Sequence, residues 1–235
     1  MSNPSPIVVI TGAFGALGRA VASAFEARGA QLALLDVAPQ PPAVVRAQLG
    51  PAPLVFGNVD LTDMEATRRV IAATAMRFGG IDVLVNIAGG FQWQKLEDGD
   101  PETWDQLYAM NLRTAVVCCK AALPAMLERR SGRIINIGAG AAAGRAAAGM
   151  GAYTASKAGV QRLTESLSEE VKDRGITVNA ILPGTIDTPR NRAEMPNADF
   201  SRWVAPDEIA AVILFLASDA ARAVTGAAIP VFGRG

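Results

Sequence analysis

The sequence predicts an α/β protein built on one doubly wound parallel sheet of seven strands, with helices on both faces. Short apolar, β-branched runs alternate with longer helical patterns from one end of the chain to the other. The strand runs are continuously apolar, as expected for strands that are covered on both faces. No segment rich in Pro, Ser or charge divides the 235 residues. Because strand–helix alternation produces right-handed crossovers between parallel strands, we expect a single domain over 1–235.

The elements follow in order along the chain. The predicted strands are 7–11, 31–36, 54–56, 81–86, 133–137, 176–182 and 228–232. Helices are predicted where apolar residues recur at three- and four-residue spacing, over 17–28, 63–78, 102–130, 152–173 and 206–218. The Pro-rich patch 39–42 and the Ala/Gly-rich stretch 138–151 are predicted loops. Residues 183–200 show no clear periodicity, and long irregular segments of this kind are usually lids or binding loops.

The composition excludes several classes of function. The 22 Lys and Arg residues balance 22 Asp and Glu residues, without the basic run that nucleic acids or anionic membranes attract. The chain has no His, which excludes Ser-His-Asp and Cys-His mechanisms and His-rich metal sites. Cys118 and Cys119 lie in an apolar helical run and predict buried thiols in a reducing compartment. With no apolar run near 20 residues and no signal-peptide pattern over 1–6, we expect a cytoplasmic protein.

A glycine-rich loop lies at the first strand–helix junction, in the sequence TGAFGALG over 11–18. Glycines there let the backbone approach a pyrophosphate, and the following helix presents free N–H groups to it. The positions expected to contact a dinucleotide are Gly12, Phe14, Gly15, Ala16, Leu17 and Gly18. This context predicts a Rossmann-type cofactor site rather than a purely structural turn.

Asp36 ends the second predicted strand, 18 residues after Gly18. A carboxylate at this point can accept both hydrogen bonds of an adenosine ribose diol and would repel a 2′-phosphate. No Arg follows Asp36 directly in the sequence. NAD(H) is therefore favoured over NADP(H). The alternative interpretation is a solvated carboxylate after a structural turn.

Tyr153 and Lys157 are spaced i and i+4 near the start of a predicted helix, so that they share one face. A free phenol, with a pKa near 10, is a poor acid–base catalyst at neutral pH. A neighbouring ammonium favours the phenolate, so we expect Lys157 to lower the pKa of Tyr153 and the pair to transfer a proton. Alone, this spacing would more often mark an ordinary surface pair.

Together these motifs resemble the short-chain dehydrogenase/reductase family over nearly the whole chain, although Ala16 follows Gly15 where the family usually has Gly. Further matching positions are Asp60 and Leu61 beside adenine, Asn86, Ala88 and Gly89 along the cofactor, Asn111 in a helix, and Pro183, Gly184, Ile186 and Thr188 around the nicotinamide. The resemblance implies that Tyr153 transfers the proton. It also implies that Lys157 holds the cofactor ribose, and that Asn111 orders a relay water. It further implies a homodimer or homotetramer through the helices 102–130 and 152–173.

The chain departs from the family at the catalytic Ser, because the candidate positions Ala139 and Gly140 carry no hydroxyl. Residues 183–203 resemble the substrate lid of dihydropteridine reductases, NADH-dependent family members that also lack this Ser. Phe91, Trp93 and Trp203 could stack on a flat substrate or could cap the core and the lid. No metal ligand set is expected.

We therefore expect an NAD(H)-dependent oxidoreductase of the EC 1.1.1 or 1.5.1 type. It would transfer hydride to or from a small cyclic or flat carbonyl or quinonoid compound. Two alternatives remain open: a dihydropteridine reductase proper, and an NAD-binding sensor or structural subunit that has lost catalysis.

Overall fold

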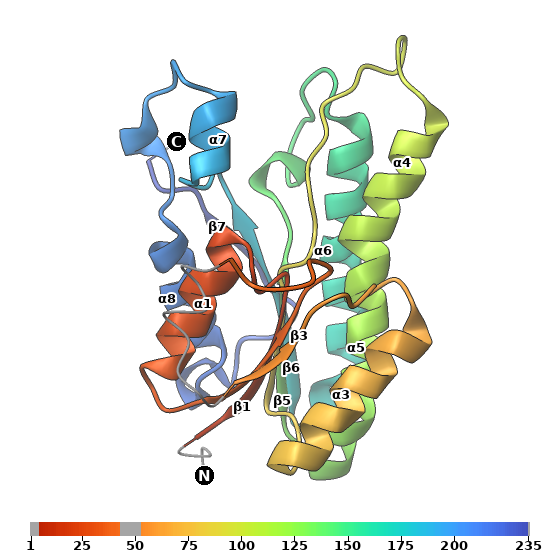
Figure 1. Ribbon diagram of the computed structural model, residues 1–235, viewed down its shortest axis with the longest axis vertical. Coiled ribbons are helices and arrows are strands. Elements are labelled where there is room, and N and C mark those ends of the chain that lie inside the picture. Colours follow the sequence, from red (N-terminus) through yellow and green to blue (C-terminus); the bar gives the residue numbers. More distant parts are fainter. Residues whose placement is uncertain (1–4, 43–52, 235) are drawn as a thin grey trace.

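The computed structural model describes residues 5–42 and 53–234, which form a seven-stranded sheet between two layers of helices (Figure 1). The strands are β1 (Ile7–Thr11), β2 (Gln31–Leu35), β3 (Leu54–Phe56), β4 (Val83–Asn86), β5 (Gly132–Ile137), β6 (Ile176–Pro183) and β7 (Ala228–Val231). Their order in the sheet is β3-β2-β1-β4-β5-β6-β7, and every neighbouring pair is parallel. The predicted doubly wound sheet is confirmed.

The helices divide between the two faces of the sheet. In Figure 1, α1 (Ala16–Glu26) and α8 (Pro206–Leu216) cover one face, and α3 (Met64–Phe78), α5 (Thr114–Arg129) and α6 (Gly151–Val171) cover the other. Each face has its own core cluster. Val8 and Ile10 of β1 belong to the cluster with α1, whereas Val9 belongs to the cluster with α5. Burial on both faces explains why the strands are apolar without alternation.

Two predicted segments differ from the structure in detail. The expected helix 102–130 consists of α4 (Pro101–Tyr108), a π-helical turn (Ala109–Arg113) and α5. The irregular segment 183–200 contains the short helix α7 (Pro189–Glu194), whose start is capped by Thr188 through a hydrogen bond from the Asn191 amide. A six-residue helix is too short to produce a periodic apolar stripe, which is why the sequence did not reveal it.

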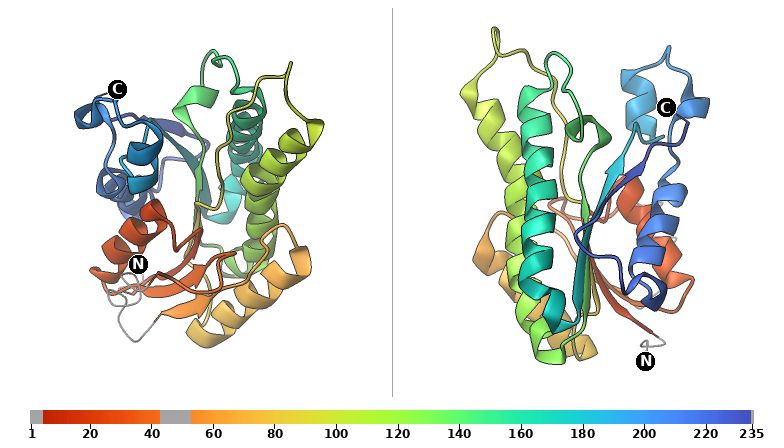
Figure 2. Two further views of the ribbon diagram at one scale, coloured as in Figure 1. Left: turned by 45° about the horizontal axis from the view of Figure 1, so that its top comes forward. Right: turned by 180° about the vertical axis from the view of Figure 1, so that it is seen from behind.

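The strand order reverses between β1 and β4, and ligands of open α/β sheets bind where the carboxyl ends of such strands diverge. Figure 2 shows what surrounds this edge of the sheet. The ends of α4 (yellow-green) and α6 (teal) rise on one side, and α7 (light blue) rises on the other. The sheet topology thus predicts the functional site at this edge, between the two layers.

One helical run, Pro101–Arg129, is long and apolar enough by composition to cross a membrane, with a mean hydropathy of 1.2. The sequence predicted a helix over 102–130 but no apolar run long enough to span a membrane. Half of its most apolar window is buried inside the fold, which is also the behaviour of a core helix. Its length and composition are therefore weak grounds for a membrane span.

Candidate active site

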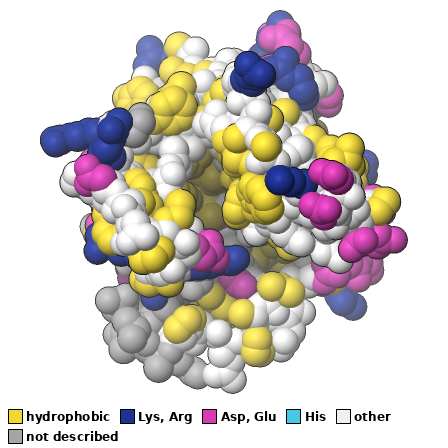
Figure 3. Space-filling view, turned by 90° about the horizontal axis from the view of Figure 1, so that it is seen from above, with side chains coloured by type: hydrophobic (Ala, Val, Ile, Leu, Met, Phe, Trp, Pro, Cys, Tyr) yellow, Lys and Arg dark blue, Asp and Glu magenta, His cyan; other side chains and the backbone are white. Residues whose placement is uncertain are grey.

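A large cleft of about 2170 Å³ opens at the carboxyl edge of the sheet in the described part of the chain. Figure 3 looks into it and shows hydrophobic side chains around the hollow, with most charged groups farther out. Its lining includes Gly12, Phe14, Gly15, Ala16, Leu17, Gly18, Asp36, Asp60, Leu61, Ala88, Gly89, Phe91, Ala139, Gly140, Tyr153, Lys157, Pro183, Gly184, Ile186, Thr188 and Trp203. Pockets for drug-sized ligands reach about 1,000 Å³. This cleft therefore has room for a dinucleotide and a small substrate together.

The glycine loop is built by close backbone contacts. A Cβ atom on Gly18 would lie 2.3 Å from the Gly12 carbonyl oxygen, and a Cβ on Gly12 would lie 2.9 Å from the Ala88 nitrogen. Gly12 also has a φ of +62°, which favours glycine. Gly15 is the N-cap of α1 and supplies no side-chain cap, so the first N–H groups of this helix are open to an anion.

Thr11 is the first residue of the glycine-rich motif 11–18, and it joins this loop to the next one. Its Oγ1 accepts hydrogen bonds from the backbone N–H groups of Ile87 (3.0 Å) and Ala88 (3.1 Å). The segment after β4 is thereby held against the glycine loop. The position of Thr11 at the carboxyl end of a strand is the sequence feature that points to this role.

Asp36 lies in the cleft beside the glycine loop. Its carboxylate accepts hydrogen bonds from the N–H groups of Phe14 (2.9 Å) and Ala38 (3.0 Å). A carboxylate has about four acceptor positions, so about two are left for a ligand. Asp60 accepts from the hydroxyl and the N–H of Thr62, and these hydrogen bonds lower its pKa. Asp60 therefore remains anionic at neutral pH.

Tyr153 and Lys157 reach the cleft from the first turns of α6. Burial raises the pKa of Tyr153 to about 12, and the ring of Phe91 packs edge-on against it at 4.9 Å between centroids. Burial lowers the pKa of Lys157 to about 8, and its Nζ donates a hydrogen bond to the Ile137 carbonyl oxygen at 2.8 Å. The expectation that Lys157 lowers the pKa of Tyr153 is wrong for this arrangement. Desolvation of the phenol dominates, and the amine is held by a backbone carbonyl.

Lys157 should make the stability of the protein depend on pH. Its folded-state pKa of about 8 lies below the ordinary 10.5, so between these values only the unfolded chain keeps the proton and stability rises with pH. From about pH 7.5 to about pH 9.5, the free energy of unfolding should increase by about 2 kcal/mol more in the wild type than in Lys157→Met. Urea denaturation at both pH values measures this difference. Equal increases in the two proteins would contradict the assignment.

Asn111 lies in the π-helical turn and does not line the cleft. Its Oδ1 accepts from the Gly90 N–H (2.9 Å), and its Nδ2 donates to the Gly90 carbonyl (3.1 Å) and to Ser156 Oγ (3.0 Å). Both amide protons are therefore used within the protein. A side-chain role in ordering a relay water is not supported, because this amide instead ties the loop after β4 to α6.

Gly89 lies between that amide and Lys157. A Cβ atom at this position would lie 2.5 Å from Asn111 Oδ1 and 3.2 Å from Lys157 Nζ. Only a residue without a side chain lets the loop pass this close to both groups. Gly89 thus lines the cleft while Asn111 stays beneath it.

Asn86 also lies outside the cleft lining, against the expectation that it contacts the cofactor. Its Nδ2 donates to Asn136 Oδ1 at 2.8 Å, and Asn136 in turn donates to Thr164 Oγ1 at 2.9 Å. These buried groups connect β4 and β5 to α6 through the core. The side chain of Asn86 points into the protein, so it supports the sheet and the helix that carries Tyr153.

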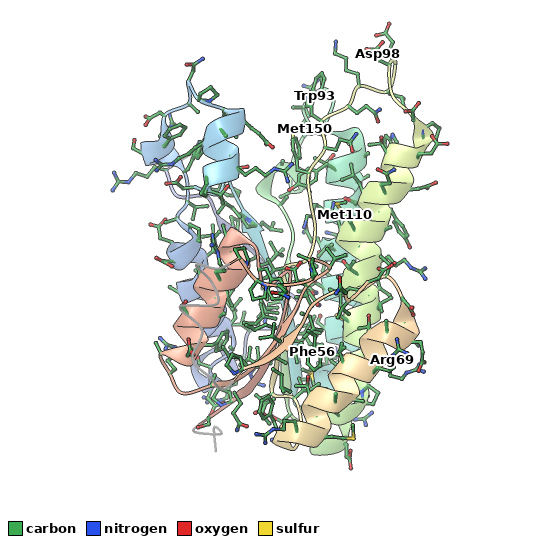
Figure 4. All side chains as sticks on the ribbon, in the orientation of Figure 1. Phe56, Arg69, Trp93, Asp98, Met110 and Met150 are labelled. Carbon is green, nitrogen blue, oxygen red and sulfur yellow. The ribbon has the colours of Figure 1, made fainter. Side chains whose placement is uncertain are left out.

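Trp93 does not line the cleft either, so stacking on a substrate is not supported. Its indole N–H donates to the Ala148 carbonyl at 3.0 Å, and the next residue's N–H donates to the Gly149 carbonyl at 2.8 Å. Figure 4 shows Trp93 beside Met150, just before α6 begins. Trp93 therefore fastens the loop after β4 to the loop before α6.

Contacts within the segment 183–203, and with the residue that follows it, hold this segment in place. Ile186 forms a parallel bridge with Val204, and Asp187 holds Arg192 through two hydrogen bonds of 2.6 and 2.7 Å. The guanidinium of Arg192 lies 4.7 Å from the centre of the Phe200 ring, and Phe200 packs on Trp203 at the same separation. This chain of contacts holds Trp203 at the cleft.

The other arginine of α7 is also paired. Arg190 contacts Glu194 at 2.7 Å. Together with the pairing of Arg192, this disfavours recognition of an acid by these two arginines. In the ranges 5–42 and 53–234, no group of three or more His, Cys, Asp or Glu side chains is placed to hold a metal ion.

Comparisons with known proteins agree with this geometry. Residues 6–199 match the family model described as short chain dehydrogenase. D-threitol dehydrogenase of Mycolicibacterium smegmatis is 36% identical over 238 residues, which cover 97% of this chain and 91% of the relative. The crystal structure of levodione reductase superposes with a TM-score of 0.87 at 30% identity, covering 97% of this chain and 96% of that one.

A further solved structure shows how little the fold says about the substrate. A protein named ribose-5-phosphate isomerase from Brucella melitensis 16M superposes with a TM-score of 0.89 at 30% identity, covering 99% of this chain and 93% of that chain. Two proteins with this fold are thus named as a reductase and as an isomerase. The substrate has to be argued from the side chains of the cleft.

Proposed function

The chain belongs to the short-chain dehydrogenase family, and from this premise we propose that it is an NAD(H)-dependent oxidoreductase of a small, cyclic or flat carbonyl or quinonoid compound. The family and its dehydrogenase and reductase relatives support the oxidoreductase role in general. The observation that carries the specific proposal is the position of Tyr153 and Lys157. Both lie in the same cleft as the glycine loop and Asp36.

The residues present fit a nicotinamide dinucleotide. The close approach at Gly12 and Gly18 leaves a backbone cradle that a Cβ would fill, and the open N-terminus of α1 suits a pyrophosphate. Asp36 has acceptor positions left for a ribose diol, and Gly89, Pro183 and Gly184 supply lining without large side chains. When bound, this cofactor supplies the hydride. The protein supplies binding, orientation and the proton.

Tyr153 is the proton donor in the direction of reduction. With its pKa near 12 the phenol is protonated at neutral pH, so it can give its proton to the carbonyl oxygen that becomes an alcohol. Lys157 has its Nζ in the cleft lining, where it can turn from the Ile137 carbonyl to a ligand hydroxyl. Asn111 acts as a positioning residue, because it fixes the backbone of Gly90 and the Ser156 hydroxyl beside the pair.

The experiment follows the absorbance of NADH while cyclic ketones, quinones and quinonoid dihydropterin are supplied in turn. Consumption above background with a cyclic or quinonoid compound supports the proposal, and a preference for the pterin favours dihydropteridine reductase. The lack of a hydroxyl at 139 and 140 favours one further candidate, an NAD-binding sensor. Tight NADH binding without consumption of any compound would leave the sensor as the better interpretation.

Asp36 should set the preference between the two nicotinamide cofactors. We expect NADH to bind at least about tenfold more tightly than NADPH, a difference of about 1.4 kcal/mol, because the carboxylate repels a 2′-phosphate. Asp36→Asn removes the charge at nearly constant size and should shrink the preference, whereas Asp98→Asn, in a distant exposed loop, should leave it unchanged. Fluorescence titration measures both affinities. Equal affinity of the wild type for both cofactors contradicts the assignment.

Assembly and location follow as further parts of this proposal. The run Pro101–Arg129 and α6 carry the proposed dimer or tetramer contacts, and α5 exposes apolar Val116 at 38%. A cytoplasmic location and a small-molecule substrate, without nucleic acid or membrane partners, complete the proposal. The class EC 1.1.1 fits a ketone substrate, and 1.5.1 fits a pterin.

A further inference from the structure

Phe232 follows the last strand of the sheet and lines the active-site cleft, and none of the motifs singled it out. Its ring lies over Gly140, one of the two positions where the family's catalytic Ser was expected. A Cβ atom on Gly140 would lie 2.4 Å from Cε1 and 3.0 Å from Cζ of this ring. The aromatic ring therefore fills the space that a side chain at 140 would occupy.

The backbone around Phe232 is held on the side of the sheet. The Gly184 N–H donates to the Val231 carbonyl at 3.0 Å, as β6 and β7 continue their pairing. A Cβ atom on Gly184 would lie 3.1 Å from both Cα and O of Phe232. Glycine at 184 therefore lets the end of β7 lie close against the end of β6, which places the ring at the cleft.

The lid holds the same segment from the other side. The Arg234 N–H donates to the Arg202 carbonyl at 3.0 Å, and Arg202 Nε donates back to the Arg234 carbonyl at 3.3 Å. Between them Gly233 has a φ of +70°, and a Cβ there would lie 3.1 Å from the Trp203 carbonyl. Phe232 is thus placed between the end of the sheet and the lid residue Trp203.

The part of the cleft around Phe232 differs chemically from a site that carries a side-chain hydroxyl. Ala139, Gly140 and Phe232 line the cleft without a side-chain hydrogen-bond donor. Phe91 packs against Tyr153, and Trp203 also lines the cleft. Arg190 and Arg192 are paired with acids of the lid. Apolar rings gain most from flat apolar partners, and the side chains of Phe91, Trp203 and Phe232 offer no partner for a buried charge.

Resting on the proposed function, we propose that Phe232 is a specificity-determining residue that selects uncharged, flat ring ketones. Its ring takes the place of a donor side chain at 140 and holds the substrate by contact. The reacting oxygen is then left to the hydroxyl of Tyr153. A ring conjugated with its carbonyl suits this arrangement, because conjugation keeps the ring and the carbonyl in one plane, so that a flat face can lie against Phe232.

The test compares Phe232→Ala with the wild type on two uncharged probes, the flat ring ketone 1-tetralone and the open-chain ketone hexan-2-one. For 1-tetralone we expect kcat/KM to fall by at least about tenfold, mainly through a higher KM. For hexan-2-one the change should stay within about threefold, and the NADH affinity should stay within about twofold. Equal losses on the two ketones, or no loss on 1-tetralone, would overturn the proposal.

Gly140 provides a second test that leaves Phe232 in place. Gly140→Ala should displace the ring and raise the KM for 1-tetralone, and the double variant with Phe232→Ala should be no worse than Phe232→Ala alone. Gly144→Ala is the matched control, because a Cβ there meets nothing within 4 Å. If Gly140→Ala behaves like this control, the ring is not seated as proposed.

Calorimetric binding of 1-tetralone to the protein saturated with NAD+ separates this proposal from the proposed function. If the ketone binds tenfold more weakly to Phe232→Ala but is never reduced, the specificity assignment stands and the oxidoreductase function fails. If reduction occurs without discrimination by Phe232, the function stands and this inference fails. If the wild type neither binds nor reduces 1-tetralone, the inference is also wrong.

Discussion

Tyr153→Phe is expected to lower kcat for a ketone substrate by about 10²- to 10⁴-fold, the contribution typical of a positioned general acid. The substitution removes only the hydroxyl. The ring that packs edge-on against Phe91 is retained, and so is the start of α6. Because the proposed cofactor cradle lies in the glycine loop, NADH affinity should stay within about twofold. The substitution thus isolates proton transfer from binding.

Steady-state turnover and a fluorescence titration of NADH on the same preparations measure the two quantities. The matched control is Tyr108→Phe at the one other tyrosine of the chain, which is 52% exposed on α4. This control should keep full activity. A Tyr153→Phe enzyme with wild-type kcat would show that another group supplies the proton, and a combined loss of NADH binding would point to a structural role.

The sequence predicted those parts of the site that depend on local backbone geometry. The glycine loop, Asp36 directly after β2 and the i, i+4 pair of Tyr153 and Lys157 all reach the same cleft. In each case a short stretch of chain and its position on a strand or helix determine where the group lies. The parallel sheet then brings these carboxyl-end groups together, whatever loops connect them.

The predictions that differ from the structure concern the direction of single side chains. In the sequence, Asn86, Trp93 and Asn111 are close to residues that line the cleft. Their side chains turn instead to partners on other segments, which are Asn136, Ala148 and Gly90 respectively. Local sequence carries no information about these partners. Phe232 was missed for the same reason, since its ring meets Gly140 only after β7 has joined β6.

The pKa values changed the interpretation of the catalytic pair as well. Spacing alone suggested that an ammonium beside the phenol would lower its pKa. Burial acts on both groups at once and raises the pKa of Tyr153 while lowering that of Lys157. The phenol of Tyr153 is therefore protonated at neutral pH, which is the form that could donate a proton during reduction.

Gly18→Ala is expected to abolish measurable NADH binding, a loss of at least about 100-fold. The new methyl group would lie 2.3 Å from the Gly12 carbonyl oxygen and 2.6 Å from Ala13 Cα. Both contacts are with backbone atoms, so no side chain can rotate away, and the loop and α1 must separate. Overpacking of a tight contact costs about 1–3 kcal/mol, and here the displaced atoms form the proposed phosphate cradle itself.

Gly15→Ala is a milder substitution in the same loop and serves as the comparison for Gly18→Ala. Its methyl group would lie 3.4 Å from the same Gly12 oxygen, at the limit of ordinary contact, and its φ of −73° suits any residue. Its loss of NADH affinity should therefore be far smaller than that of Gly18→Ala. Circular dichroism and thermal melting establish whether each variant is folded before NADH is titrated. A folded Gly18→Ala protein that binds NADH as tightly as Gly15→Ala would show that the cofactor does not depend on the close approach of Gly18 to Gly12.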